Sequence, residues 1–196
     1  MNRKMQTVID LTSIPVIQTR NYYLRGIKME DIPTIFPFMS DKETMKYITP
    51  QPVKTIEELR LTTLKSLENF EQKKEIPWVI VHKQQNHVIG MFRFHKLHTW
   101  HQKTEMGVVI DKNYQQTGVM TEILPEILAF GFNQLGLNRI VGDIFADNKG
   151  SEKLMEKFGF HKDGVLRETD FDGTNYYDTV VYSMLKSEYK ERRENL

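Results

Sequence analysis

The residues best suited to chemistry form one stretch, from 108 to 122, with the sequence VVIDKNYQQTGVMTE. Its pattern is an apolar strand, a polar turn containing Gly118, and the start of a helix. The first backbone amides of a helix lack partners inside it, and the helix dipole adds positive potential at the same end. A glycine there lets an anion approach the backbone closely. The stretch predicts an anion site, although an ordinary loop before a core helix is the simpler explanation of this segment taken alone.

Three histidines, His95, His98 and His101, are spaced by three residues and invite a metal interpretation. They fall at the end of an expected strand and in a loop, and no carboxylate accompanies them at the spacing of a ligand set. The chain also contains no cysteine, which excludes a disulfide, a thiolate metal site and a cysteine nucleophile. We therefore expect no metal.

The elements that must position the anion site follow from hydrophobic periodicity. Strands are expected at 22–27, 78–82, 87–94, 105–111 and 139–145, with a strand pair in 160–185 around Asp172-Gly173. Helices are expected at 30–39, 55–70, 118–135 and 149–158. The order βααβββαβαββ predicts an α/β (α+β) fold, with a mixed sheet and helices on its faces.

The length of 196 residues indicates one domain. We expect an N-terminal arm at 1–18, a single domain at 19–185 and a C-terminal tail at 186–196. No apolar run has the roughly 18 residues of a membrane span, and the first residues do not resemble a signal peptide. A net charge of +1 offers no basic face for nucleic acid. We expect a cytoplasmic protein that is a monomer or a weak dimer and binds neither membrane nor nucleic acid directly.

Several motifs, taken in order, resemble those of GNAT acetyltransferases, especially the branch that acetylates the N-terminal alanine of ribosomal proteins. The motifs are Gln115-Gln-Thr-Gly118-Val-Met120, matching a Q/R-x-x-G-x-G/A loop, then Asn148 with Ser151, and then Glu156-Lys-Phe-Gly-Phe160. The resemblance extends from about Thr19 to Leu185. It implies a GNAT fold, in which the central sheet is splayed between two neighbouring strands.

The resemblance also implies acetyl-CoA as cosubstrate, lying between the strand that ends near Ile110 and the strand at 139–145. A backbone amide within 108–110 would bind the thioester carbonyl and the developing oxyanion, and the amides of 116–121 would bind the pyrophosphate. The residues expected to contact acetyl-CoA are Val108, Val109, Ile110, Gln115, Gln116, Thr117, Gly118, Val119, Met120, Thr121, Asn148 and Ser151.

Two residues are expected to be catalytic. Glu105 occupies a strand position where this branch often has a glutamate, and we expect it to take the proton of the amine, directly or through water. The alternative is a strand carboxylate that faces solvent or a basic neighbour. Ser151 could reach the sulfur as an acid, or could be an ordinary first-turn serine. The resemblance implies that Asn148 bonds the pantetheine or backbone of the cofactor, and the alternative is a helix N-cap.

The chain departs from the family at three positions. Gln116 and Met120 are bulkier than the glycine or alanine that the family prefers, and could narrow the anion loop. Many GNAT enzymes place a tyrosine acid in the last of these helices, where this chain has Met155. The predicted reaction is acetyl transfer to a primary amine, either a protein N-terminus or a small molecule such as a polyamine or a drug. We expect Trp100 and the nearby histidines to border the acceptor pocket. A non-catalytic acetyl-CoA-binding module is the alternative.

Overall fold

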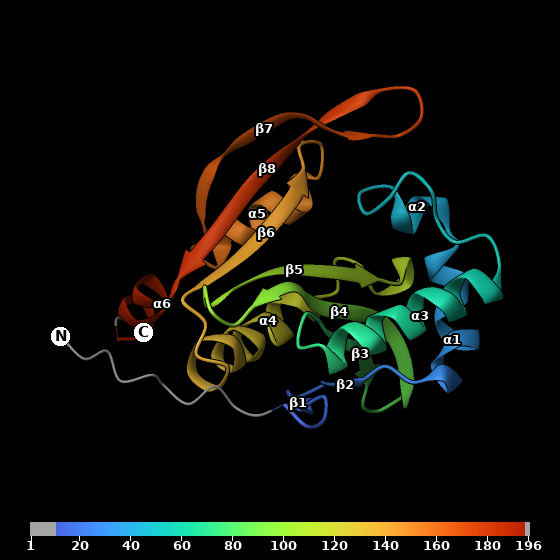
Figure 1. Ribbon diagram of the computed structural model, residues 1–196, viewed down its shortest axis with the longest axis horizontal. Helices are drawn as coiled ribbons and strands as arrows, with labels where there is room; N and C mark the ends of the chain where they lie inside the picture. The colour runs from blue at the N-terminus through green and yellow to red at the C-terminus, as the bar shows by residue number, and fades with distance from the viewer. Residues whose placement is uncertain (1–10, 195–196) are drawn as a thin grey trace.

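A single eight-stranded sheet organises the protein, and the computed structural model describes residues 11–194 of it (Figure 1). The strands are β1 (Ile17–Gln18), β2 (Tyr22–Gly26), β3 (Ile76–His82), β4 (His87–His98), β5 (Lys103–Ile110), β6 (Arg139–Phe145), β7 (His161–Phe171) and β8 (Tyr176–Leu185). Their order in the sheet is β1-β2-β3-β4-β5-β6-β8-β7. Neighbours are antiparallel except β5 and β6, which are parallel. The predicted mixed sheet is confirmed.

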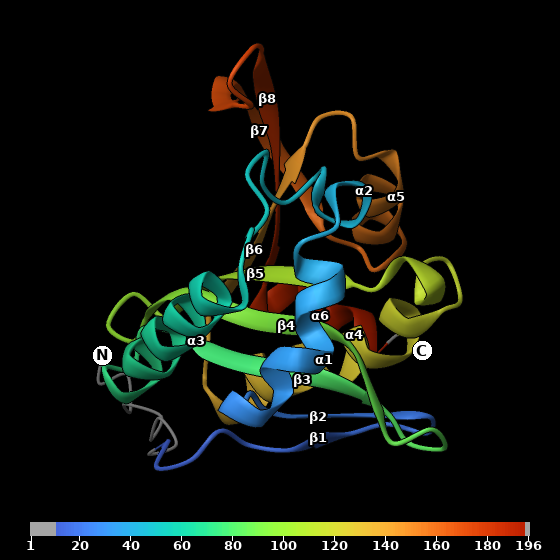
Figure 2. The same ribbon diagram turned by 90° about the vertical axis from the view of Figure 1, so that its right-hand side faces the viewer.

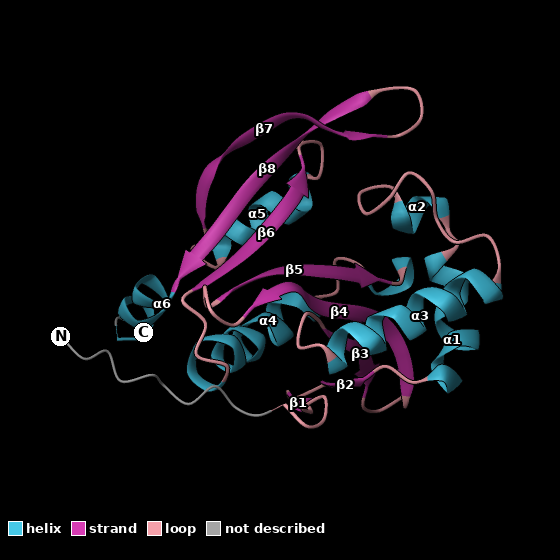
Figure 3. Ribbon diagram, viewed as in Figure 1, coloured by secondary structure: helices cyan, strands magenta, loops and turns pink. Residues whose placement is uncertain are grey.

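The helices connect these strands (Figure 3). They are α1 (Ile32–Met39), α2 (Lys42–Met45), α3 (Ile56–Glu71), α4 (Val119–Ala129), α5 (Lys149–Lys157) and α6 (Lys186–Glu194), with short 3₁₀ turns η1 (Met29–Asp31) and η2 (Lys112–Tyr114). The helix expected at 118–135 is α-helical only to Ala129. It continues as one π-helical turn, η3 (Phe130–Gln134), in which the Leu135 amide donates to the Phe130 carbonyl at 2.9 Å. Gly136, with φ +71°, follows that turn.

Each face of the sheet packs against its own helices, and Figure 2 shows α1 and α3 over one face. On that face, Ile35 and Leu59 pack with the β3 residues Val79 and Val81. Because side chains alternate along a strand, Trp78 and Ile80 point the other way. They belong to a larger core with residues of α4 such as Ile123 and Ile127. We call these the α3 face and the α4 face.

The expected arm and tail both contribute to the packed domain within the described residues. Ile17 pairs with Leu24, and the indole Nε1 of Trp78 donates to the Pro15 carbonyl at 2.7 Å. At the other end, the α6 residue Tyr189 stacks on Phe132 with ring centroids 4.9 Å apart. The boundaries predicted at 18 and 185 therefore do not separate packed from unpacked chain. Residues 1–10 of the expected arm and 195–196 of the tail lie outside the described residues.

The sheet divides between β5 and β6. These strands pair only from Lys103↔Arg139 to Glu105↔Val141, three residue pairs in all. Beyond them, β5 stays paired with β4 as far as Ile110, and β6 stays paired with β8 as far as Phe145. The two strands diverge, as Figure 1 shows. We call the region between residues 106–110 of β5 and 142–145 of β6 the split, and the last pair, Glu105↔Val141, the fork.

The two tryptophans provide a matched test of this packing. Trp78 is fully buried and Trp100 is 85% exposed. Trp78→Phe leaves the Pro15 carbonyl without its donor, and an unsatisfied buried group costs about 1–3 kcal/mol. We expect urea unfolding to show a loss of that size in Trp78→Phe. The control Trp100→Phe should change stability by less than about 0.5 kcal/mol. Equal losses in both variants would contradict the docking of residue 15 against the core.

Candidate active site

The inner edge of β5 presents unpaired backbone groups to the split. In an antiparallel ladder, successive residues alternate between bonding the partner strand and facing away from it. The Asp111 amide donates to the Ile89 carbonyl at 2.9 Å, so every second residue of β5 counted back from Asp111 bonds β4. The amide of Val109 therefore points toward β4, whereas those of Val108 and Ile110 point into the split. Of the three amides expected to serve the thioester carbonyl, the geometry favours these two.

The predicted anion loop follows β5 and leads into α4. Gly118 is the N-cap of α4 in a left-handed conformation, with φ +90°. A Cβ atom placed there would meet nothing within 4 Å, so the space beside the backbone is open. Within residues 11–194, no amide from 116 to 121 donates a hydrogen bond to another group. Six amides around an open glycine suit an anion such as a pyrophosphate.

Two departures from the family pattern have different consequences in this loop. Gln116 adopts φ +61°, a left-handed conformation that costs a residue with a Cβ roughly 1–2 kcal/mol. A glycine would adopt it freely, which gives the family's preference a physical reason. Met120 instead packs against the α4-face core, so its side chain does not narrow the loop.

The loop is braced from both sides. On one side, Glu122 of α4 accepts from the Thr19 hydroxyl and the Asn21 amide, both at 2.6 Å, and from Asn21 Nδ2 at 2.7 Å. Burial acts to raise the pKa of Glu122, but these hydrogen bonds outweigh it and lower that pKa. The turn before β2 therefore holds the first turn of α4.

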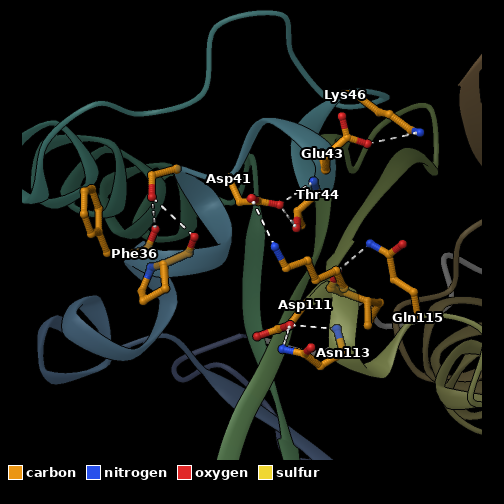
Figure 4. A network of polar contacts seen from close by, with 12 residues as sticks. Phe36, Asp41, Glu43, Thr44, Lys46, Asp111, Asn113 and Gln115 are labelled. Atoms are coloured by element: carbon orange, nitrogen blue, oxygen red, sulfur yellow. Dashed lines mark hydrogen bonds and ion pairs between the residues drawn. The ribbon is translucent and has the colours of Figure 1, made fainter.

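On the other side, Asp41 links the loop to α2 (Figure 4). Its Oδ2 accepts from the Thr44 amide at 2.8 Å and from the Thr44 hydroxyl at 2.7 Å, while Lys112 Nζ lies 3.4 Å from Oδ1. The Thr44 bonds, and then Lys112, lower the pKa of Asp41. The side chain of Gln115 also donates to the Ile110 carbonyl at 2.9 Å. These contacts join the loop to α2 and to the end of β5.

Asn148 lies at the start of α5 and has the capping role given above as the alternative. Its Oδ1 accepts from the Ser151 amide at 3.1 Å, so Asn148 is the N-cap of α5. The Ser151 hydroxyl donates to no other described residue. Met155, at the position of the family's tyrosine, is buried, and its sulfur would lie 3.3 Å from a Cβ placed on Gly142 of β6. The apolar side chain of Met155 therefore occupies the position at which many GNAT enzymes have a tyrosine.

Glu105 lies at the fork and already has a cationic partner. Its Oε2 is 2.6 Å from Lys96 Nζ, so the alternative of a basic neighbour applies to one of its two oxygens. The β4–β5 ladder shifts register between His95 and His98, and Lys96 has φ +49°. Such a bulge redirects a side chain, here toward Glu105. Lys96 was not among the residues expected at the site, because the bulge has no signal in the sequence of this stretch.

A cleft of about 440 Å³ opens beside Glu105 at the closed end of the split. Its lining residues are Lys96, Leu97, His98, Lys103, Thr104, Glu105, Arg139 and Val141. Trp100, His95 and His101 do not line it. Of the residues expected at the acceptor pocket, His98 alone borders this cleft.

His95 and Asp143 have perturbed titration near the fork. Burial, and then the charge of Arg93, lowers the pKa of His95 to about 4, which leaves the imidazole neutral at pH 7. Asp143 of β6 is exposed to solvent, yet the walls around it partly desolvate its carboxyl. This desolvation, and then the charge of Glu105, raises the pKa of Asp143. Alternate residues of a strand face the same side, so the predicted strand at 139–145 already placed Asp143 on the same face as Arg139 and Val141.

No group of three or more His, Cys, Asp or Glu residues in 11–194 could hold a metal ion. No helix in the same range is both long and apolar enough to cross a membrane. The cytoplasmic location and the oligomeric state stay predictions.

Comparison with known proteins identifies the family to which this geometry corresponds. A family model described as an acetyltransferase (GNAT) domain matches residues 21–161. YoaA of Bacillus subtilis (strain 168), an uncharacterised N-acetyltransferase, is 33% identical over 174 residues, which cover 88% of this chain and 97% of YoaA.

Relatives with named acceptors are more distant. The spermidine N(1)-acetyltransferase of Vibrio cholerae serotype O1 is 23% identical over 171 residues, covering 87% of this chain and 96% of that enzyme. Among solved structures, RimL, the ribosomal L7/L12 alpha-N-protein acetyltransferase in complex with coenzyme A, matches with a TM-score of 0.81. The match covers 89% of this chain and 99% of RimL at 17% identity, and it shows a shared fold.

His95 offers a direct test of the charges at the fork. We expect an NMR titration to place its pKa near 4, below the ordinary 6.5. Arg93→Gln should move that pKa upward, because it removes a positive charge, while the remote Lys65→Gln should not. The unfolded chain binds a proton at His95 below about pH 6.5 and the folded protein does not. His95 therefore lowers the free energy of unfolding as the pH is reduced from about 6.5 to about 4. A His95 pKa of 6 or above would contradict the desolvated environment.

Proposed function

This chain belongs to the GNAT acetyltransferase family and is an N-acetyltransferase, and we propose that its donor is acetyl-CoA and its acceptor a primary amine. The observation that supports this most strongly is the split itself. It places the unpaired backbone edge of β5 next to a loop of six free amides around Gly118. The assignment to an enzyme family disfavours the non-catalytic binding module.

The residues that would hold the donor lie along one continuous path. We assign the pyrophosphate to the amides of 116–121, with Gln115 fixing the loop to β5 through the Ile110 carbonyl. We assign the carbonyl of the donor to the amide of Val108 or Ile110. Acetyl-CoA, when bound, supplies an acetyl thioester as the electrophile. The Nδ2 group of Asn148 remains available for the pantetheine, because only Oδ1 is used in the cap.

The amine attacks only as a neutral group, so a residue must accept its proton. We assign this role to Glu105. Lys96 pairs with Oε2, and no described residue donates a hydrogen bond to Oε1, so Oε1 is the oxygen available to an amine or to a water. Because Met155 cannot donate a proton, we assign the Ser151 hydroxyl as proton donor to the departing thiolate.

The acceptor itself is a proposal at the level of class. The relatives named above include a spermidine acetyltransferase and an acetyltransferase of a ribosomal protein N-terminus, and both acceptors are primary amines. The cleft beside Glu105 is open to solvent and lined by both polar and apolar side chains, which suits either kind of acceptor. Turnover with a panel of amines, read as release of free coenzyme A, would distinguish the two classes.

Gly118→Val tests the donor site. Acetyl-CoA at about 100 times its Kd should stabilise the wild-type protein by about 2.7 kcal/mol, seen as a rise in Tm. The valine should remove most of that rise, because it fills the space that the pyrophosphate needs. Gly136→Val is the matched control, since Gly136 also has positive φ and open space, at +71°, and lies outside the loop. Both variants should lose basal stability, but only Gly118→Val should lose the shift. An unchanged shift in Gly118→Val would place the pyrophosphate elsewhere.

Glu105→Gln tests the base. Loss of a general base lowers turnover by roughly 10²–10⁴-fold. Glutamine keeps the size of the side chain, so the Tm shift with acetyl-CoA should persist. The pH profile of turnover should also change in the variant, because the group proposed to accept the proton of the amine is removed. Glu126→Gln, on the exposed side of α4, removes the same charge away from the split and should keep wild-type turnover. Near-normal turnover of Glu105→Gln with an unchanged pH profile would assign the proton to water.

A further inference from the structure

Asp143 occupies a distinctive place in the split. The last pair between β5 and β6 is Glu105↔Val141, and Asp143 lies two residues beyond it on β6. Two residues in a strand return a side chain to the same face. Ile140 and Ile144 belong to the α4-face core, so Asp143 points to the α3 face. It is the first residue on the β6 wall of the split that points to that face.

Glu105 shares this face from the opposite strand. The neighbours of Glu105 on β5, Thr104 and Met106, are directed toward the α4 face, where Met106 packs against the core. Glu105 therefore points to the α3 face, as Asp143 does. Opposite Asp143 on β5, at the level of residue 107, stands a glycine, and the side chains of Arg93 and His95 lie 3.3 and 3.7 Å from a Cβ atom placed there. The two carboxyl groups therefore border the same opening from its two walls. Partial desolvation, and then the charge of Glu105, raises the pKa of Asp143.

Three other charged side chains near this opening already have partners. Lys96 pairs with Glu105 at 2.6 Å, and Arg139 pairs with Asp163 at 2.6 Å. Asp170, on β7, accepts hydrogen bonds from two threonine hydroxyls. Asp143 makes no hydrogen bond or ion pair with any residue in 11–194. Partial desolvation of a carboxylate without a partner is unfavourable, and a bound cation relieves it.

We propose that Asp143 binds the cationic, ammonium form of the acceptor amine and holds it at the fork beside Glu105. This inference rests on the proposed function, since it names a residue that selects the acceptor of that reaction. The ammonium group then gives one proton to Glu105, which becomes a carboxylic acid, and the neutral amine remains in place. Asp143 keeps its charge throughout. It is thus a specificity-determining residue that favours acceptors protonated at neutral pH.

Asp143→Asn tests the assignment by separating binding from chemistry. With spermidine as acceptor, KM should rise about tenfold, while kcat changes less than about threefold and KM for acetyl-CoA stays within about twofold. Asp143→Glu, which keeps the charge, should recover a large part of the loss. The wild-type KM for spermidine should rise with salt, and that dependence should weaken in Asp143→Asn. Glu126→Gln should behave as the wild type in each measurement.

Two further comparisons make the outcome specific. Aniline is uncharged at pH 7, so its KM should not change in Asp143→Asn, whereas a short peptide with a free N-terminus should follow spermidine. Asp143→Ser repeats the test in case the asparagine variant is poorly folded. An equal loss with aniline and spermidine, or no loss with spermidine, would overturn the role of Asp143. Wild-type protein that acetylates no amine would overturn the proposed function, and the role of Asp143 with it.

Discussion

The parallel pairing of β5 and β6 stops after three residue pairs, and the rest of the candidate site depends on that interruption. Each strand continues along its outer neighbour, β5 with β4 and β6 with β8, while the inner edges of β5 and β6 diverge and stay unpaired with each other. Backbone amides and carbonyls at an interrupted edge still require partners. An extended ligand with amide groups of its own can supply them. The division of the sheet therefore creates a binding site from backbone groups that any sequence carries.

The anion loop is useful only if it is held at the end of this split, and two polar anchors hold it there. Glu122 ties the first turn of α4 to Thr19 and Asn21, and Lys112 ties the start of the loop to Asp41. The first anchor joins the anion loop to the turn before β2. The second joins it to α2. Contacts of this kind allow the two halves of the site to keep a common geometry.

The chemistry at the fork is decided by charge compensation. Glu105 has a lysine on one oxygen, His95 is neutral at pH 7 because burial and Arg93 oppose its protonation, and Arg139 is paired with Asp163. Asp143 remains as the carboxylate without a partner among the described residues. A site whose other charges are balanced directs the attraction of a cation to one position. The proposed ammonium form of the acceptor matches this distribution of charge.

The sequence by itself determined the elements whose periodicity is strong and local. The strand predicted at 139–145 has the bounds observed for β6, and the helix predicted from Gly118 begins one residue later, with Gly118 as its N-cap. The family motifs indicated the splayed sheet, which the strand pairing confirms. Tertiary structure alone decided the packing of α6, the π-helical turn after α4 and the pairing of Lys96 with Glu105. The last of these arises from a bulge in β4, and a bulge depends on register between strands rather than on the residues of one strand. The place of Asp143 opposite Glu105 has the same origin, because only the relative position of two separate strands brings their side chains to one opening.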